Sequence, residues 1–271
     1  MPGVRFTEDQ STNLATLYGR ALDARAEHPV LGDATAADVV RHIDYDFGKF
    51  KIGRYEAVGI AARGKVFDDL VRDFIRRKPE CTVVHLGVGM DSRVFRLDPS
   101  ATVRWVDVDF PDVIDLRRQL YPERDHTTMI GASVTDDWIQ QVPGDRVTLV
   151  VAEGLTMYLE PADGQELFRR VVEHFPSGEV FFDAYSKAGI KAQWMNGVVR
   201  RAKATLRWGI DDPAELAGVG LTPVSVRTAE AFLPEEDWAL LPPVQRVLYR
   251  AVLRLPALRK MGKLMHFRFG A

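Results

Sequence analysis

The stretch that decides the fold reads Cys81-Thr82-Val83-Val84-His85-Leu86-Gly87-Val88-Gly89-Met90-Asp91-Ser92-Arg93-Val94-Phe95-Arg96-Leu97. Its first six residues form a short apolar run, as in a buried parallel strand, and the residues after Met90 have the pattern of a helix. The two glycines of the intervening turn carry no Cβ, so the backbone there can approach a ligand closely. A strand, a glycine turn and a helix in this order predict a nucleotide-like ligand at one edge of a parallel sheet.

The glycine pair alone is a weak signal, because a tight turn between a strand and a helix also needs glycine. The stretch departs from two common patterns. Ser92 stands where the dinucleotide pattern G-x-G-x-x-G has its third glycine, and Asp91 stands where the methyltransferase pattern G-x-G-x-G has one. The ligand class therefore has to be decided from the rest of the chain.

The composition is that of a soluble globular protein of one α/β core with an appended helical part. The chain has 271 residues, a formal net charge of −2 and a pI near 6.3, which argues against a nucleic-acid partner. The single cysteine, Cys81, excludes a disulfide framework and a thiolate zinc site, and we expect no bound metal. No stretch has the length and apolarity of a signal peptide or a membrane span, so the cytoplasm is the expected location.

Helices precede the first strand. From about Ser11 to Arg77 the apolar residues recur at helical spacing, with a break between Pro29 and Gly32. We expect a helical cap, residues 1–78, laid over the ligand edge of a core, residues 79–271, with which it forms a single structural unit.

Strands and helices then alternate, which predicts a doubly wound α/β fold. Two further strands near the C-terminus favour an antiparallel pair closing one edge, as in the Rossmann-like, seven-stranded class I methyltransferases. Helices are expected after Asp136 or Asp137, from about Ile190 to Trp208, and in an insertion before the last strand. The predicted strands cover Cys81–Leu86, Thr102–Asp109, Thr127–Ala132, Arg146–Ala152, Glu179–Tyr185, Thr222–Arg227 and Met265–Phe269.

Two acids close the second predicted strand about twenty residues after the first glycine. Asp107 and Asp109 are two residues apart, so they face the same side of the strand, where a carboxylate can accept hydrogen bonds from both hydroxyls of a ribose. A solvated strand end would have the same acids. The spacing favours a nucleoside ligand but does not separate a nicotinamide cofactor from an adenosyl one, since both contain ribose.

Basic residues are concentrated in two late segments. Residues 245–263 contain six Lys or Arg and no acid, and the segment from Lys187 to Trp208 is equally one-sided. A positive face attracts an anionic acceptor or an acidic carrier protein. Two solvated helix faces are the alternative interpretation.

The residues quoted above resemble the leucine carboxyl methyltransferase family, especially its bacterial branch near the polyketide O-methyltransferases of the tetracenomycin type. Leu86 to Leu97 is similar to the family signature L-G-x-G-x-D-T-R-x-x-R-L, with Ser92 in place of threonine. Two further stretches are similar to the second and third signatures. These are Val106-Asp107-Val108-Asp109-Phe110-Pro111 and Ala152-Glu153-Gly154-Leu155-Thr156-Met157-Tyr158-Leu159.

The resemblance implies S-adenosylmethionine as the cofactor and assigns contacts where the motifs are kept. It implies that Arg63 pairs with the cofactor carboxylate, that Gly87 and Gly89 let the backbone approach, and that Glu153 lies near the cofactor amino group. Asp109 is expected to hold the ribose with Asp107 in support. At the adenine end, Ser133 and Val134 occupy positions where the family commonly has Asp-Leu.

The resemblance further implies an O-methyltransferase acting on a hydroxyl or carboxyl oxygen of a small molecule, such as a polyketide or an aromatic metabolite. Methylation of a protein C-terminal carboxylate, a non-catalytic partner protein that keeps the fold, and a nicotinamide dehydrogenase remain alternatives. Tyr18, Tyr158 and Tyr185 fall where they either line a substrate pocket or simply pack. His85 is interpreted as a core residue, while His42 and His266 are candidates for the pocket. The sequence assigns no catalytic base and no oligomeric state.

Overall fold

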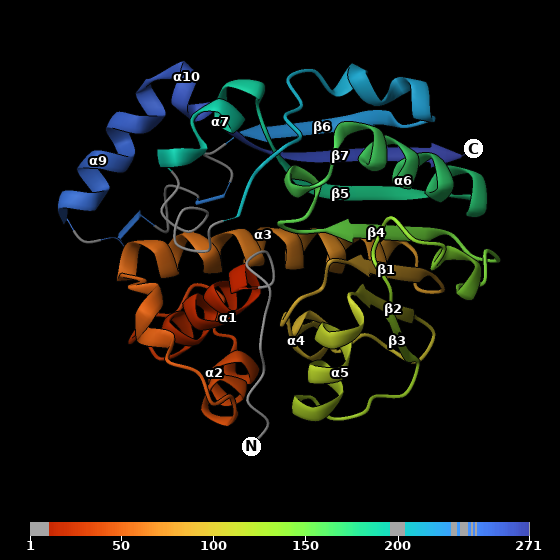
Figure 1. Ribbon diagram of the computed structural model, residues 1–271, viewed down its shortest axis with the longest axis horizontal. Coiled ribbons are helices and arrows are strands. Elements are labelled where there is room, and N and C mark those ends of the chain that lie inside the picture. Colours follow the sequence, from red (N-terminus) through yellow and green to blue (C-terminus); the bar gives the residue numbers. More distant parts are fainter. Residues whose placement is uncertain are drawn as a thin grey trace.

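A computed structural model shows a seven-stranded sheet in the order β3-β2-β1-β4-β5-β7-β6 (Figure 1). It describes residues 11–195, 204–228, 232–233, 238–239, 241 and 243–270. Strands β1 to β5 are mutually parallel, and β7 runs antiparallel to both of its neighbours. The predicted seven-stranded fold class and the late antiparallel strand are therefore confirmed. The strands are β1 (Thr82–Leu86), β2 (Arg104–Asp109), β3 (Thr127–Gly131), β4 (Thr148–Ala152), β5 (Ser177–Tyr185), β6 (Thr222–Thr228) and β7 (Gly262–Gly270).

The central strands β1 and β4 are buried along their whole length, because helices and turns cover both faces of the sheet. On one face α3 (Arg54–Arg77) and α4 (Arg93–Leu97) pack against Val83, Trp105 and Val151. On the other face α6 (Pro161–His174), η2 (Ile139–Gln141) and η5 (Pro213–Val219) contribute to a cluster with alternate residues of the same strands. Helix α5 (Pro111–Leu120) connects β2 with β3, beginning at a proline in its favoured first position.

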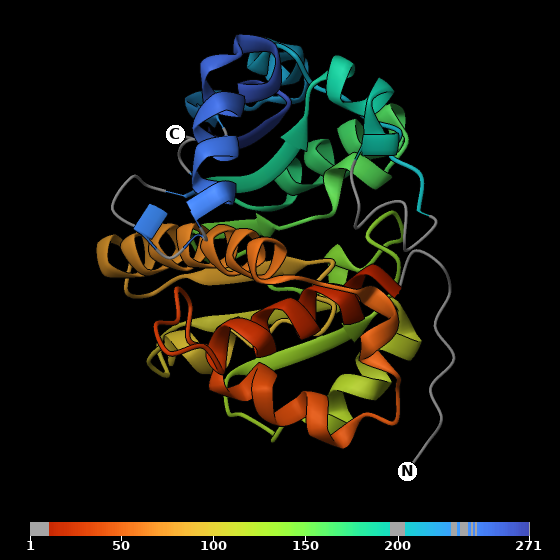
Figure 2. The same cartoon turned by 90° about the vertical axis from the view of Figure 1, so that its left-hand side faces the viewer.

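The predicted N-terminal helices are present as α1 (Ser11–Ala24), α2 (Ala34–His42) and α3, with the short η1 (Phe47–Phe50) between the last two. Asp33 caps α2 by accepting a hydrogen bond from the Ala36 N–H. Figures 1 and 2 show α1 and α2 on one side of α3. The end of α3 packs Phe67, Val71 and Phe74 directly against the sheet. The third helix thus links the helical part to the strands.

Two of the expected helices differ from the structure. The segment after Asp137 forms only the three-residue turn η2, because Trp138 and Ile139 are buried at once on the sheet and Pro143 follows. The helix predicted from about Ile190 to Trp208 does not extend to its predicted end, and residues 196–203 lie outside the described residues. That region begins with α7 (Lys187–Lys191) and η4 (Gln193–Met195), and residues 204–208 are not helical. Arg200, Arg201 and Lys203 lie outside the described residues.

The insertion before the last strand is helical, as predicted. It consists of α9 (Pro243–Arg254) and α10 (Pro256–Arg259). Earlier in the chain, the short turn η3 (Thr156–Tyr158) follows β4. Figures 1 and 2 place α9 on the side of α3 opposite to α1 and α2. Among the residues that the structure describes, no helix is both apolar enough and long enough to cross a bilayer.

Candidate functional site

The glycine turn after β1 has the backbone that its sequence predicts. Gly87 and Gly89 have φ angles of +59° and +51°, a region that other residues rarely adopt. A Cβ on Gly87 would lie 3.0 Å from the Leu155 side chain, and one on Gly89 would lie 2.8 Å from Asn13. Both positions therefore require glycine for conformation and for space, and both line pockets at the end of β1.

Asp109 closes β2 beside this turn. One carboxylate oxygen accepts a hydrogen bond from the Gly89 N–H at 2.6 Å, and the other accepts one from the Phe110 N–H at 2.8 Å. Burial raises the pKa of Asp109 to about 6, although the two backbone hydrogen bonds favour its charged form. The carboxylate is thus fixed at the mouth of a pocket, where its remaining lone pairs can accept hydrogen bonds from a diol.

Asp107 does not share this role. Its two oxygens accept hydrogen bonds from the Trp105 indole N–H at 2.8 Å and from Arg117 at 2.7 Å, and it lies fully buried outside both pockets. A direct contact from Asp107 to a ribose does not fit this geometry. Arg117 also donates to the carbonyl oxygens of Gly89 and Asp91, so Asp107 supports the glycine turn through that guanidinium.

The pocket beside Asp109 has a volume of about 220 Å³. Its walls include Phe110, Ala132, Ser133 and Val134, so the two residues predicted at the adenine end do face the pocket. The Ser133 hydroxyl lies 2.8 Å from that of Thr135, and hydrogen bonding between them orients it. These walls form an apolar slot with one hydroxyl at its edge.

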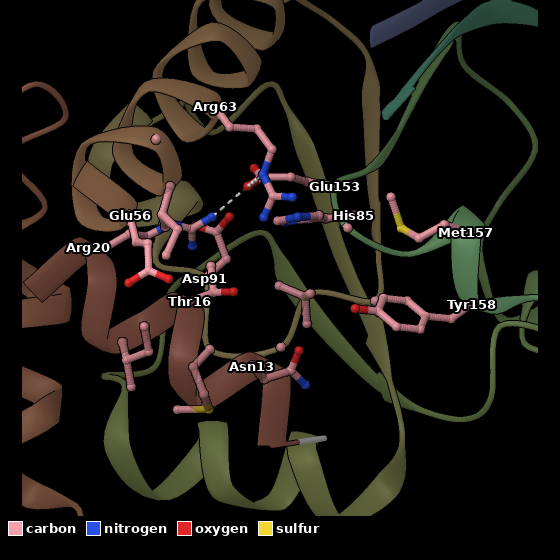
Figure 3. Close-up of a pocket in the computed structure, with 18 of the residues that line it drawn as sticks. Asn13, Thr16, Arg20, Glu56, Arg63, His85, Asp91, Glu153, Met157 and Tyr158 are labelled. Atoms are coloured by element: carbon pink, nitrogen blue, oxygen red, sulfur yellow. Dashed lines mark hydrogen bonds and ion pairs between the residues drawn. The ribbon is translucent and has the colours of Figure 1, made fainter. Parts of the chain in front are cut away.

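A second pocket, of about 420 Å³, lies between α1, the start of α3 and the ends of β1 and β4 (Figure 3). Arg63 and Glu153 both face it, as predicted. Arg63 donates to Glu153 at 3.0 Å and to Asp183 at 3.1 Å, while 27% of its side chain remains exposed. The guanidinium therefore stands in the wall with part of its surface open to a ligand.

Glu153 accepts hydrogen bonds from three arginines, Arg20, Arg63 and Arg93. Burial favours its neutral form, but these three cations outweigh burial and lower its pKa to about 2. Burial favours the neutral form of Asp91 as well, but Arg20, Arg93 and Arg96 hold its pKa well below its ordinary value. Figure 3 shows Arg20, Arg63 and Glu153 converging on the deep end of the pocket, where the charges are almost fully matched by one another.

The two pockets adjoin, since Asn13, Gly87, Gly154 and Tyr158 line both. The apolar slot and Asp109 lie at one end, and the arginine and carboxylate cluster lies at the other. A ligand with an adenine, a ribose and a zwitterionic tail has matching partners along this continuous crevice. The glycine turn forms its floor.

The predicted substrate-lining tyrosines divide into two groups. Tyr158 and Tyr185 line the larger pocket. Tyr18 lines neither pocket, because its ring stacks on Phe47 at 5.3 Å within the apolar cluster of the helical part, which is the packing alternative. The helical spacing identifies Tyr18 as semi-buried but does not tell which neighbours surround it.

The histidines provide no obvious base. His85 lines the larger pocket, but its Nε2 accepts a hydrogen bond from Arg93 at 3.1 Å, and burial followed by Arg93 lowers its pKa to about 3. His42 is exposed on α2, and His266 on β7 pairs with Glu179 on β5 at 3.0 Å. Neither histidine lines either pocket.

Sequence reasoning missed several residues that line the crevice, above all Asn13, Arg20 and Phe110. Phe110 follows Asp109 directly, so its place in the motif was a usable signal. Arg20 and Asn13 lie on α1, and only the packing of that helix over the glycine turn brings them to the site.

Comparisons with known proteins agree with this geometry. The leucine carboxyl methyltransferase family matches residues 13–172. The tetracenomycin polyketide synthesis O-methyltransferase TcmP of Streptomyces glaucescens is 41% identical over 98% of both chains. An S-adenosyl-L-methionine-dependent methyltransferase of Gibberella zeae, dpfgK, is 36% identical over 79% of both.

Solved structures show the same fold at low identity. A Streptomyces avermitilis protein of the DUF574 family has a TM-score of 0.57 at 14% identity, covering 94% of this chain and 97% of its own. A Thermobifida fusca protein has a TM-score of 0.56 at 18% identity, covering 93% and 94%. The match to the family extends over more than half of the sequence. The chain therefore belongs to the leucine carboxyl methyltransferase family.

Proposed function

We propose that the protein is an S-adenosylmethionine-dependent O-methyltransferase whose acceptor is a small molecule bound in the larger pocket. The observation that carries the proposal is the continuous crevice from Ser133 and Val134, past Asp109 and the two glycines, to Arg63. Each part of it matches a part of the cofactor in the order adenine, ribose and amino acid. Relatives aligned over most of both chains carry methyltransferase names, which supports the same function.

The residues present fit this cofactor. A Cβ on Gly87 or Gly89 would press against Leu155 or Asn13, which line the crevice, and Asp109 offers a fixed acceptor for the ribose hydroxyls. Arg63 presents part of its guanidinium to the carboxylate of the amino acid, a geometry suited to paired hydrogen bonds. Glu153 lies beside Arg63, where its negative charge would attract the amino group of the cofactor. The bound cofactor supplies a methyl group on a sulfonium, which an oxygen attacks in line.

The larger pocket also has a set of apolar and aromatic lining residues. These are Tyr55, Ile60, Met157, Tyr158, Tyr185 and Leu206. These side chains exclude water and can hold a flat acceptor beside the methyl donor, so the contribution of the protein is mostly alignment. A cavity of this size, about 420 Å³, supports a small-molecule acceptor rather than a long protein segment.

Two acid–base groups that line the pocket, His85 and Glu153, favour an acceptor that is already ionised. The imidazole of His85 has a pKa of about 3 and its Nε2 is occupied, while Glu153 has a pKa of about 2 and is held by cations. Such groups are poor proton acceptors for a phenol, whose pKa is about 10. A carboxylate needs no base. We therefore propose a carboxyl oxygen as the attacking group.

Incubation with methyl-labelled cofactor and a cell extract, followed by mass identification of the labelled product, tests the function. We expect a small carboxylic acid to gain one methyl group. The kcat of that reaction, at saturating cofactor, should stay constant between pH 6.5 and 8.5, because the acceptor is ionised throughout. A rise of about tenfold per pH unit would assign a phenol instead, and a product labelled at a protein C-terminus would assign the alternative acceptor. Cofactor binding without transfer to any acceptor would favour a scaffold role.

Cofactor binding is expected to depend on pH through Asp109. The ribose hydroxyls are best held by the ionised carboxylate, and the pKa of Asp109 in the free protein is about 6. Lowering the pH from 7 to 5 should therefore weaken the affinity by roughly tenfold, of which about fivefold falls between pH 6 and pH 5. Calorimetric titration with S-adenosylhomocysteine at a series of pH values measures this. The Asp109→Asn variant should bind more weakly, and its affinity should not change near pH 6. If the affinity of that variant still falls near pH 6, a group other than Asp109 causes the pH dependence.

A further inference from the structure

Helix α9 has an apolar stripe on the side that faces away from the rest of the protein. Val244, Val247, Ala251 and Leu255 follow one another at intervals of three and four residues, so they lie in one line along the helix and the turn after it. The side chains of Val244, Val247 and Leu255 are 80%, 68% and 54% exposed, and Ala251 is exposed as well. An ordinary surface helix would have polar residues at these positions.

The opposite side of α9 is the one that packs. Tyr249 contacts the cluster formed by Trp238, Leu241, and Val58 and Ala62 of α3. Arg246 donates to the carbonyl oxygens of Ala239 and Leu241. Because the inner side of α9 already packs against the rest of the protein, the outer stripe is a second apolar surface on this helix.

One flank of the stripe is basic. Arg250 and Arg254 are exposed on consecutive turns, and the exposed Lys260 follows after α10. Arg250 also lies over the Trp238 ring at 5.2 Å, which limits how far its guanidinium can move. The sequence contains no acid from Trp238 to its last residue. The stripe and its flank, called the α9 surface below, therefore combine small apolar side chains with positive charge that no acid of the same segment balances.

The α9 surface lies one helix away from the larger pocket. Helix α9 packs on Val58 and Ala62 of α3, and the neighbouring residues Gly59, Ile60 and Arg63 of the same turns line that pocket. A protein seated on α9 would thus be close to the start of α3, from which an acceptor carried by that protein could enter.

We propose that the α9 surface is a docking site for an acidic protein that presents an amphipathic helix, with small apolar side chains along its centre and carboxylates along its edge. Small side chains such as Val and Ala allow two helices to approach closely, and the carboxylates would face Arg250, Arg254 and Lys260. The delivery of an acceptor by this partner rests on the proposed function. The docking itself does not.

Other occupants fit the α9 surface less well. A helix that binds a membrane surface usually inserts Trp, Phe or several Leu, whereas this stripe offers two valines, one alanine and one leucine. A second copy of the chain would bring the same cations to the interface, and this segment would supply no carboxylate to balance them.

The test uses the full chain and a fluorescent 18-residue helical peptide with an Ala/Leu stripe flanked by Glu. Binding followed by anisotropy should saturate at 50 mM salt and weaken at least fivefold at 300 mM, because exposed ion pairs are screened. The variant R250E/R254E and the variant V247D should each lose at least fivefold in affinity. The matched charge reversal R227E/R268E, at exposed positions of β6 and β7, should change the affinity by less than twofold.

Several results would overturn the proposal. These are no binding of the acidic peptide, equal binding of a peptide with Lys in place of Glu, or equal losses in both double variants. Vesicles with anionic lipid that bind through Val247 while the peptide does not would assign a membrane instead. A dimer in sedimentation equilibrium that V247D dissociates would assign a second copy. Because the peptide assay contains no cofactor or acceptor, its failure would leave the methyltransferase proposal intact, and failure of methyl transfer would leave docking intact.

Discussion

Replacing Asp109 by alanine is expected to weaken binding of S-adenosylhomocysteine by about a hundredfold or more. The carboxylate would accept hydrogen bonds from two ribose hydroxyls, and each hydrogen bond to a charged group is worth roughly 1.5–3 kcal/mol. The substitution also leaves the N–H groups of Gly89 and Phe110 without their acceptor, so the glycine turn loses its support. Calorimetric titration at pH 7.5 measures the change.

Asp112, in the first turn of α5, provides the matched control for this substitution. It lies three residues further along the chain and lines neither pocket. Asp112→Ala should change the affinity by less than threefold. An Asp109→Ala protein that folds and binds as tightly as the unmodified chain would remove Asp109 from the site.

Replacing Arg93 by methionine is expected to lower the free energy of unfolding by about 3–5 kcal/mol. The guanidinium is fully buried, donates to Asp68 at 2.7 Å and to Glu153, and forms an ion pair with Asp91 at 3.4 Å. Without this guanidinium, the buried carboxylates of Asp68, Asp91 and Glu153 lose one of the cations that compensate their charge. For a chain of this size the melting temperature should fall by about 10 °C.

An exposed arginine serves as the comparison for Arg93. Arg72 pairs with Asp69 at 2.8 Å on the solvent side of α3, and Arg72→Met should change stability by no more than about 0.5 kcal/mol. Thermal unfolding of both variants followed by circular dichroism gives the two values. Similar losses in both, or a stable Arg93→Met protein, would show that the buried charges contribute little to the fold.

The parts of the fold that the sequence predicts well are those set by local pattern. The glycine turn follows from Gly87 and Gly89, whose positive φ angles no other residue adopts easily, and β1 and β4 follow from short apolar runs between breaks. The end of β2 places Asp109 at the sheet edge for the same reason. Helices expected from local sequence alone are predicted less well. After Asp137 only the turn η2 forms, because Trp138 and Ile139 pack on the sheet.

The parts that could not be predicted depend on which residues meet in space. Asp107 and Asp109 have the same character in the sequence, yet Arg117 and Trp105 occupy both oxygens of Asp107 and leave only Asp109 at a pocket. Arg20 reaches Glu153 across 133 positions of the chain, and Asp183 reaches Arg63 across 120. Spacing along one segment contains no information about such pairs.

Calorimetric titration of the unmodified chain with S-adenosylhomocysteine, beside a titration with NADH, tests the central claim most directly. We expect one molecule of S-adenosylhomocysteine to bind per chain with a micromolar dissociation constant and NADH to give no heat of binding. Binding of NADH alone would assign a nicotinamide cofactor to the crevice at Gly87, Gly89 and Asp109. Binding of neither ligand would contradict the function proposed for it.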